Sequence, residues 1–241
     1  MGTGEPLDRF LARRTKLSWA EARHAIHRRR VAIDGRVGKQ YHVALARGAV
    51  VTLDGIAIAD APDDAVVLCH KPAGWACSHL PAHAPLLYDL VPEPLRHPDL
   101  QAAGRLDRDT TGLIVLAIEG RLIQRLTTPR AGRWKRYRIA YRGTLASDAP
   151  DLVARGLSIP DDERPCLPAR LTLGAQAEGA GEATLELSEG RNHQVKRMLL
   201  ALGATVTRLH RDRIGGLALP HDLRPGGMRA ASADELAVLF A

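Results

Sequence analysis

Hydrophobic and polar residues alternate along several stretches of the chain in the manner of half-buried β-strands. These stretches are 136–145, 168–173, 182–190 and 204–219. Residues 113–118, with the sequence LIVLAI, are apolar at every position, which predicts a strand covered on both faces. Because the predicted strands follow one another with few helices between them, the pattern favours an α+β fold with a mainly antiparallel sheet and flanking helices.

A capping box predicts the first clear helix. Ser18 and Glu21 have the S-x-x-E spacing, and no Gly or Pro interrupts the chain from there to Arg30. At helical spacing one face of this segment is apolar and another is cationic. The cationic face consists of Arg23, His27 and Arg30. We therefore expect a helix that packs on one side and is basic on another.

Two β-hairpins are predicted after this helix, around Asp34-Gly35 and Asp54-Gly55. The helix and hairpins together make a compact module. The segment that follows, ADAPDDA at residues 59–65, is acidic and contains proline, as linkers do. We therefore expect a small helix-plus-hairpin domain over residues 1–61 and a larger domain over residues 62–241.

Two helices are expected in the larger domain. Residues 119–128 are compatible with a short one. Residues 192–203 predict a longer one with an apolar stripe, in which Asn192 would cap the first turn and Gly203 would end the helix.

The charge of the chain is positive and unevenly distributed. Its 34 Lys and Arg residues exceed its 27 Asp and Glu residues, giving a net charge of +7. The first 60 residues contain eleven of the basic residues and six of the acids, and so hold +5 of that charge. This excess favours a polyanionic partner, or serves only solubility.

Cysteine and histidine give no support for a metal site. The three cysteines, Cys69, Cys77 and Cys166, form no C-x-x-C pair, which is typical of reduced thiols in a cytoplasmic protein. His79 and His83 have a spacing that could bind a metal on a helix, but nearby prolines favour a loop. No signal peptide is evident, and no apolar run is long enough to span a membrane.

Three polar segments are candidates for chemistry. GRLDRDTTGL places Asp107 at the edge of the buried strand, where it could be a nucleophile, although Asp is also a common turn residue. WKRYRIAYRG places Tyr137 on an apolar strand face opposite a row of arginines, which suits a half-buried strand as well as base stacking. EGRNHQVKRM gathers basic groups near a helix start, where Lys196 could keep a carboxylate ionised.

The first quarter of the chain resembles the small RNA-binding module of ribosomal protein S4. The resemblance rests on PLDRFLARRTKLSWAEARHAIHRRRVAIDG. It implies that the basic helix face and the following hairpin contact folded RNA. Arg29 stands where that family usually has Gly, so the turn after the helix is expected to differ.

The chain from about Val66 to its end resembles the pseudouridine synthases that modify ribosomal RNA. GRLDRDTTGL, KRY, HQVK and HKPAGWACS are similar to the motifs of that family. The resemblance implies that Asp107 is the catalytic aspartate, that Tyr137 stacks on the target base, and that Lys196 is the basic partner of the aspartate, where many relatives have Arg. The Thr-Thr pair and LHRDRIGG are most similar to the subgroup that acts on small-subunit 16S rRNA.

This resemblance implies the isomerisation of a specific uridine without a cofactor or a metal. The expected partner is ribosomal RNA or an assembling ribosomal subunit, with no membrane involved, and the protein is expected to be a monomer. The residues expected to contact RNA are Arg23, His27, Arg28, Arg30, Lys71, Arg105, Arg108, Arg136, Arg191, His193 and Arg197.

Alternative interpretations remain at this point. The substrate could be large-subunit 23S rRNA, or the chain could be a non-catalytic RNA-binding assembly factor in which the acids are only turn residues. A glycosidase that uses Asp107 and Asp109 as its acid pair is disfavoured, because two residues so close in one loop rarely flank a substrate.

Overall fold

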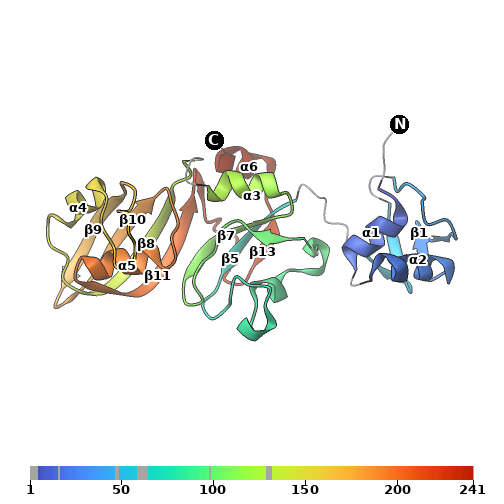
Figure 1. Cartoon of the computed structure of the whole chain (residues 1–241), viewed down its shortest axis with the longest axis horizontal. Coiled ribbons are helices and arrows are strands. Elements are labelled where there is room, and N and C mark those ends of the chain that lie inside the picture. Colours follow the sequence, from blue (N-terminus) through green and yellow to red (C-terminus); the bar gives the residue numbers. More distant parts are fainter. Residues whose placement is uncertain are drawn as a thin grey trace. The chain divides into compact units, whose positions relative to one another are not determined.

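The computed structural model describes residues 5–15, 17–46, 49–58, 65–97, 99–128 and 132–240. The chain divides into two compact units, one of residues 1–63 with 91–100 and one of residues 64–90 with 101–241. Figure 1 labels elements of both units and colours them by their position in the sequence. Most of the predicted linker, residues 59–64, lies outside the described residues.

The N-terminal unit combines two helices with a four-stranded antiparallel sheet of order β2-β1-β3-β4. Its elements are α1 (Leu7–Arg14), α2 (Trp19–His27), β1 (Val31–Ile33), β2 (Arg36–Val37), β3 (Val51–Leu53) and β4 (Ile56–Ala57). α1 was not predicted. The helices and sheet enclose a core of Leu7, Phe10, Leu11, Ala22, Ala25, Ile26, Val31 and Val51.

Local chemistry explains why these elements form where they do. The capping box is present, because Ser18 Oγ accepts from the Glu21 amide and the Glu21 carboxylate accepts from the Ser18 amide. Both predicted hairpins are confirmed. Asp34 and Gly35 have φ values of 49° and 76°, the paired positive values that a two-residue type I′ turn requires.

The larger unit is built on a nine-stranded sheet whose main path has the order β13-β5-β7-β11-β8-β10-β9. The strands are β5 (Val66–Lys71), β6 (Gln101–Ala102), β7 (Thr111–Ala117), β8 (Lys135–Gly143), β9 (Arg170–Ala177), β10 (Ala180–Leu187), β11 (Ala204–Ile214), β12 (Leu217–Ala218) and β13 (Met228–Ala230). Among these strands only β7 and β11 pair in parallel. The predicted α+β class with a mainly antiparallel sheet is confirmed.

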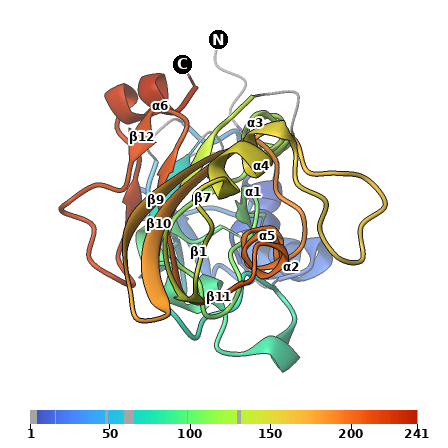
Figure 2. The same ribbon diagram turned by 90° about the vertical axis from the view of Figure 1, so that its left-hand side faces the viewer.

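The helices of this unit are short and flank the sheet. They are α3 (Gly120–Thr127), α4 (Ala149–Arg155), α5 (Gln194–Ala201) and α6 (Ala233–Phe240), with 3-10 turns at Pro81–His83 and Leu87–Leu90. A further 3-10 turn, Glu93–Leu95, belongs to the first unit. α5 packs along β11. Figure 2 shows the helix α5 nearly end-on. α3 and α5 confirm the two predicted helices, whereas α4 and α6 were not predicted.

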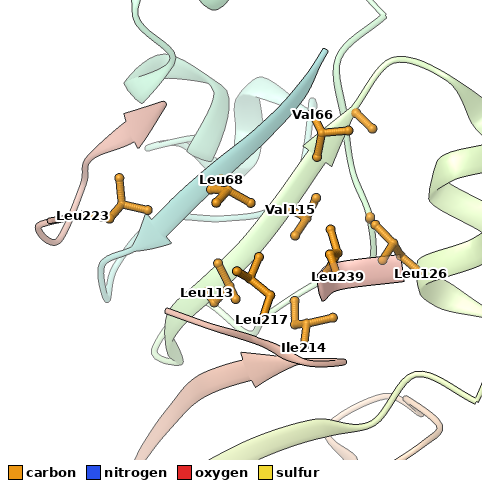
Figure 3. Close-up of a cluster of buried hydrophobic side chains, with 11 residues drawn as sticks. Val66, Leu68, Leu113, Val115, Leu126, Ile214, Leu217, Leu223 and Leu239 are labelled. Carbon is orange, nitrogen blue, oxygen red and sulfur yellow. The ribbon is translucent and has the colours of Figure 1, made fainter. Parts of the chain in front are cut away.

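A hydrophobic core on one side of β5 and β7 holds this unit together. Figure 3 shows Leu68 of β5 and Val115 of β7 in one buried cluster with Leu126 of α3 and Leu239 of α6. Every residue of β7 after Thr111 is buried, as the all-apolar LIVLAI run predicts. The strand that follows the Asp107 loop is therefore firmly fixed.

The start of α5 corrects one sequence prediction. The residue at the N-cap position is His193, not Asn192, and it adopts a left-handed conformation with φ 48° and ψ 29°. Its side chain makes no capping hydrogen bond. The C-terminal prediction is confirmed, because Gly203 follows the helix with φ 85°.

No helix among the described residues is long and apolar enough to cross a membrane.

Candidate active site

The loop that holds Asp107 is anchored by a buried lysine. Lys71, at the end of β5, is 0% exposed and donates hydrogen bonds to the backbone carbonyls of Arg108, Thr110 and Pro72 at 2.8 to 3.0 Å. Two of these carbonyls belong to the loop itself. The ammonium of Lys71 is fully enclosed and directs all three hydrogen bonds inward, which gives it a structural role. Its contact with RNA stays a prediction.

Asp107 and Lys196 form an ion pair across the site. Lys196 Nζ lies 3.0 Å from Asp107 Oδ2 and also donates to Asp109 Oδ1 at 2.7 Å. His193 Nε2 lies 3.7 Å from Asp107 Oδ1. The Asp107 and Lys196 side chains are 26% and 27% exposed, whereas Asp109 is 73% exposed. Asp107 is thus the acid that is both paired with Lys196 and partly sheltered.

Electrostatic interactions favour the charged forms of Lys196 and Asp109. Partial burial opposes the charge of Lys196, but its hydrogen bonds to Asp109 and Asp107 outweigh burial and raise its pKa. Partial burial likewise opposes the charge of Asp109, but the hydrogen bond from Lys196 outweighs it and lowers the pKa of Asp109. At neutral pH the lysine is therefore a permanent cation beside Asp107.

Tyr137 lies in the same cleft as the ion pair. The cleft has a volume of about 540 Å³, and its lining includes Asp107, Tyr137, Lys196, Arg105 and His193. β8 alternates as predicted, with Tyr137 and Tyr141 on its buried face, while Arg138 and Arg142 are exposed. The structure therefore brings the three predicted catalytic side chains to one cavity.

Arg211 is a cleft residue that the sequence analysis missed. It is 2% exposed, lies opposite Tyr137 in the β8–β11 register, and donates from Nη1 to the Tyr137 hydroxyl at 3.3 Å. Its Nε donates to the Leu113 carbonyl at 2.8 Å. The available signal was its position two residues after Leu209, on the inward side of a strand.

A glycine permits the close approach that places Arg211 beside the Asp107 loop. Gly112 pairs with Arg211 between β7 and β11 and has φ 114°. A Cβ at position 112 would overlap the carbonyl of Arg211, so any other residue would push the strands apart.

Several predicted RNA-binding arginines already have protein partners. Arg136 lies outside the Asp107 cleft, and its guanidinium makes two hydrogen bonds to Asp212, at 2.8 and 3.0 Å. Arg191 bonds to Glu189 and to two backbone carbonyls, and Arg197 bonds to the Pro160 carbonyl. These contacts give the three side chains structural roles. Their contact with RNA stays a prediction.

The remaining predicted RNA-binding residues differ in their surroundings. Arg105 is exposed at the cleft, while the exposed Arg108 donates to the Gly74 carbonyl at 2.9 Å. In the N-terminal unit, His27 and Arg28 are exposed and Arg30 pairs with Asp54. Within the described part of the chain, no cluster of His, Cys, Asp and Glu could hold a metal ion.

Comparison with known proteins identifies the family. Residues 65–201 match the family described as RNA pseudouridylate synthase. The chain is 36% identical over 232 residues to a protein of Escherichia coli named ribosomal small subunit pseudouridine synthase A, with 96% of this chain and 98% of the relative covered. The chain belongs to the RNA pseudouridylate synthase family. A protein of the same name from Vibrio parahaemolyticus is 35% identical over 230 residues, with 95% of this chain and 97% of that protein covered.

A solved structure supports the same assignment for the fold of this synthase. A crystal structure described as that of a pseudouridylate synthase is 30% identical, with a TM-score of 0.66. The match covers 98% of this chain and 100% of that chain. The enzyme is therefore an isomerase of the pseudouridylate synthase class.

Replacing Lys71 with methionine should destabilise this synthase by about 2–4 kcal/mol, because the loop carbonyls would lose their ammonium donor. The free energy of unfolding, measured by urea titration, tests this. Product formation by the folded variant should also fall, because Asp107 loses its anchor. A variant as stable and as active as the parent would show that Lys71 does not hold the loop.

Lys135 is a second buried lysine, and we expect its replacement to have the opposite effect on stability. It is 7% exposed and lines the cleft, and its ammonium donates to the Glu189 carbonyl at 3.5 Å. Burial, together with the neighbouring Arg211 charge, lowers the pKa of Lys135 from 10.5 to about 8. Between these two values the unfolded chain binds a proton that the folded chain lacks, so the stability of the parent should rise with pH.

Lys135→Met should therefore stabilise the protein at pH 7, by at most about 3 kcal/mol, and the gain should shrink as pH rises towards 10. Urea midpoints of parent and variant at both pH values measure this. A gain that does not change with pH would contradict a buried, weakly basic lysine.

Proposed function

We propose that this synthase converts one uridine of small-subunit ribosomal RNA to pseudouridine, with Asp107 as the nucleophile. The observation that carries the proposal is the Asp107–Lys196 ion pair in one cleft with Tyr137. The names of the curated relatives support the choice of small-subunit rRNA. The N-terminal unit, which resembles the S4 module, would add affinity for folded RNA.

The reaction rearranges one nucleotide. The bond between ribose C1′ and base N1 breaks, the base turns, and a bond forms between C1′ and C5, while the proton on C5 is lost and N1 gains one. Every atom of the product is already in the substrate, and the oxidation level does not change. The proposal therefore includes neither a cofactor nor a metal.

Each cleft residue has a distinct part in this scheme. The uridine is flipped out of the RNA at a cost of a few kcal/mol, and stacking on Tyr137 would return part of that cost. Asp107 attacks as an anion, at either the sugar or the ring, with the Lys196 ammonium paired to it. Arg105, exposed at the mouth of the cleft, would contact the displaced backbone.

A comparison of substrates tests the choice of RNA. The protein would be incubated separately with small- and large-subunit rRNA transcripts and with a small-subunit assembly intermediate. We expect modification of one position in small-subunit RNA and none in large-subunit RNA. Modification of large-subunit RNA alone would overturn the substrate while leaving the reaction class intact. We further propose that the protein acts as a monomer in the cytoplasm.

A further inference from the structure

The N-terminal unit presents an ordered aromatic surface that the reaction does not use. The Arg23 guanidinium carbon lies 3.9 Å from the centre of the Trp19 ring and 4.9 Å from that of Tyr41. Trp19 and Tyr41 are 51% and 39% exposed. We call these three residues the Trp19 stack. Two large aromatic rings held at the surface around a cation are unusual for a merely solvated helix face.

A buried carboxylate holds the Trp19 stack in place. Asp8 is 1% exposed, and its Oδ2 accepts from Trp19 Nε1 at 3.0 Å and from Arg23 Nε at 2.9 Å. Its Oδ1 accepts from the Arg9 amide at 2.9 Å. Burial opposes the charge of Asp8, but the hydrogen bonds from Arg23 and Trp19 outweigh it and lower its pKa. The indole and the guanidinium are therefore fixed before any ligand arrives.

A hollow of about 260 Å³ lies beside the indole. It is lined by Trp19 with Arg9, Ala12 and Arg13 of α1. Arg9 and Arg13 are one helical turn apart, so both reach the same side of the hollow. Arg13 also pairs with Glu5 at 2.9 Å. Arg23 does not line this hollow.

An aromatic ring beside arginines matches the chemistry of an unpaired nucleotide. A base can stack on the indole, and its phosphate can pair with the flanking guanidinium groups. Paired bases in a duplex have no free face for this contact. The N-terminal 60 residues hold +5 of the net charge, which suits an RNA ligand better than a neutral protein surface.

We propose that the Trp19 stack and its hollow bind one unpaired nucleotide of the substrate RNA, outside the catalytic cleft. This inference rests on the proposed function for the identity of the RNA. The base lies on Trp19, and Arg9 and Arg13 hold its phosphate. Such a contact adds affinity and helps to select substrates that have an unpaired nucleotide.

Tryptophan fluorescence tests this directly. The chain has three tryptophans, so the double variant Trp75→Phe/Trp134→Phe leaves Trp19 as the only one. Titration with a short single-stranded oligouridylate should quench its emission, whereas a duplex RNA of similar length should quench much less. The proposal would be overturned if the single-stranded RNA caused no quenching, or if both RNAs quenched the emission equally.

A second measurement uses the otherwise unaltered protein. Trp19→Leu should weaken binding of the substrate RNA about tenfold, within the range measured for one base stacked on an aromatic ring. Its rate at saturating RNA should stay unchanged. Trp19→Phe is the matched control and should recover part of the affinity. If the parent forms pseudouridine and Trp19→Leu binds RNA equally well, this site is refuted while the proposed function stands.

Discussion

Asp107→Asn should lower the rate of pseudouridine formation by roughly 10⁴-fold or more, the scale seen when a catalytic nucleophile is removed. Asparagine has nearly the same shape as aspartate but bears no negative charge, so it cannot attack the nucleotide. The measurement is a single-turnover assay with saturating enzyme, in which weaker binding would not lower the observed rate.

Asp109→Asn is the matched control for this variant. Asp109 bonds the same Lys196 ammonium but is 73% exposed, so its loss should cost only a few-fold. Binding of RNA should change less than twofold in either variant. If Asp109→Asn proved to be the inactive variant, the nucleophile would have been assigned to the wrong carboxylate. If Asp107→Asn lost its fold and its RNA binding together, the residue would be a structural turn residue.

Lys196→Met should have the second largest effect, a loss of about 10²- to 10³-fold in the single-turnover rate, comparable to the removal of one preorganised charged donor. The ammonium lies 3.0 Å from Asp107 Oδ2, and methionine keeps the length of the side chain without the charge. The Asp107 carboxylate would then lack the cation that pairs with it and orients it.

Lys196→Arg separates charge from geometry. A guanidinium can pair with Asp107 in a bidentate manner, so this variant should retain most of the rate that Lys196→Met loses. Equal losses in both variants would show that a positive charge alone is not sufficient and that the geometry of the ammonium is also required. No loss in either would contradict a role for the ion pair.

The elements with strong local signals could be predicted from the sequence. The hydrogen bonds of the capping box join Ser18 and Glu21, which are only three residues apart, so the local sequence is enough to predict them. The turns at Asp34 and Asp54 follow from residues that tolerate positive φ. The buried strand β7 follows from an unbroken apolar run. α1, α4 and α6 were not predicted, because they are short and their place depends on packing against the rest of their unit.

The candidate site was predictable only in part, because basic side chains look alike in a sequence. Lys71 and Lys196 both stand in motifs similar to those of the family, yet one lies beneath the loop and the other faces Asp107. Only the pairing of β5 with β7 brings Lys71 under Thr110, 39 residues further along the chain. Arg211 was missed for the same reason, since its contact with Tyr137 spans two strands.

The alternation of residues predicted the two faces of β8 but not which residues each face contacts. Tyr137 was placed correctly on the buried face, and its cleft also receives residues from the Asp107 loop and from the start of α5. Arg136 points to the other face, where Asp212 from β11 engages it. A charge pattern alone shows neither the partner nor the distance to the site.

Mapping pseudouridine in small-subunit rRNA, after incubation with the purified protein and no added cofactor, tests whether the protein isomerises a uridine through Asp107. Carbodiimide-dependent stops in reverse transcription locate the modified base. We expect one new stop with the parent protein and none with Asp107→Asn. Tight binding of RNA without a new stop on small- or large-subunit rRNA would contradict this expectation and would favour a non-catalytic assembly factor.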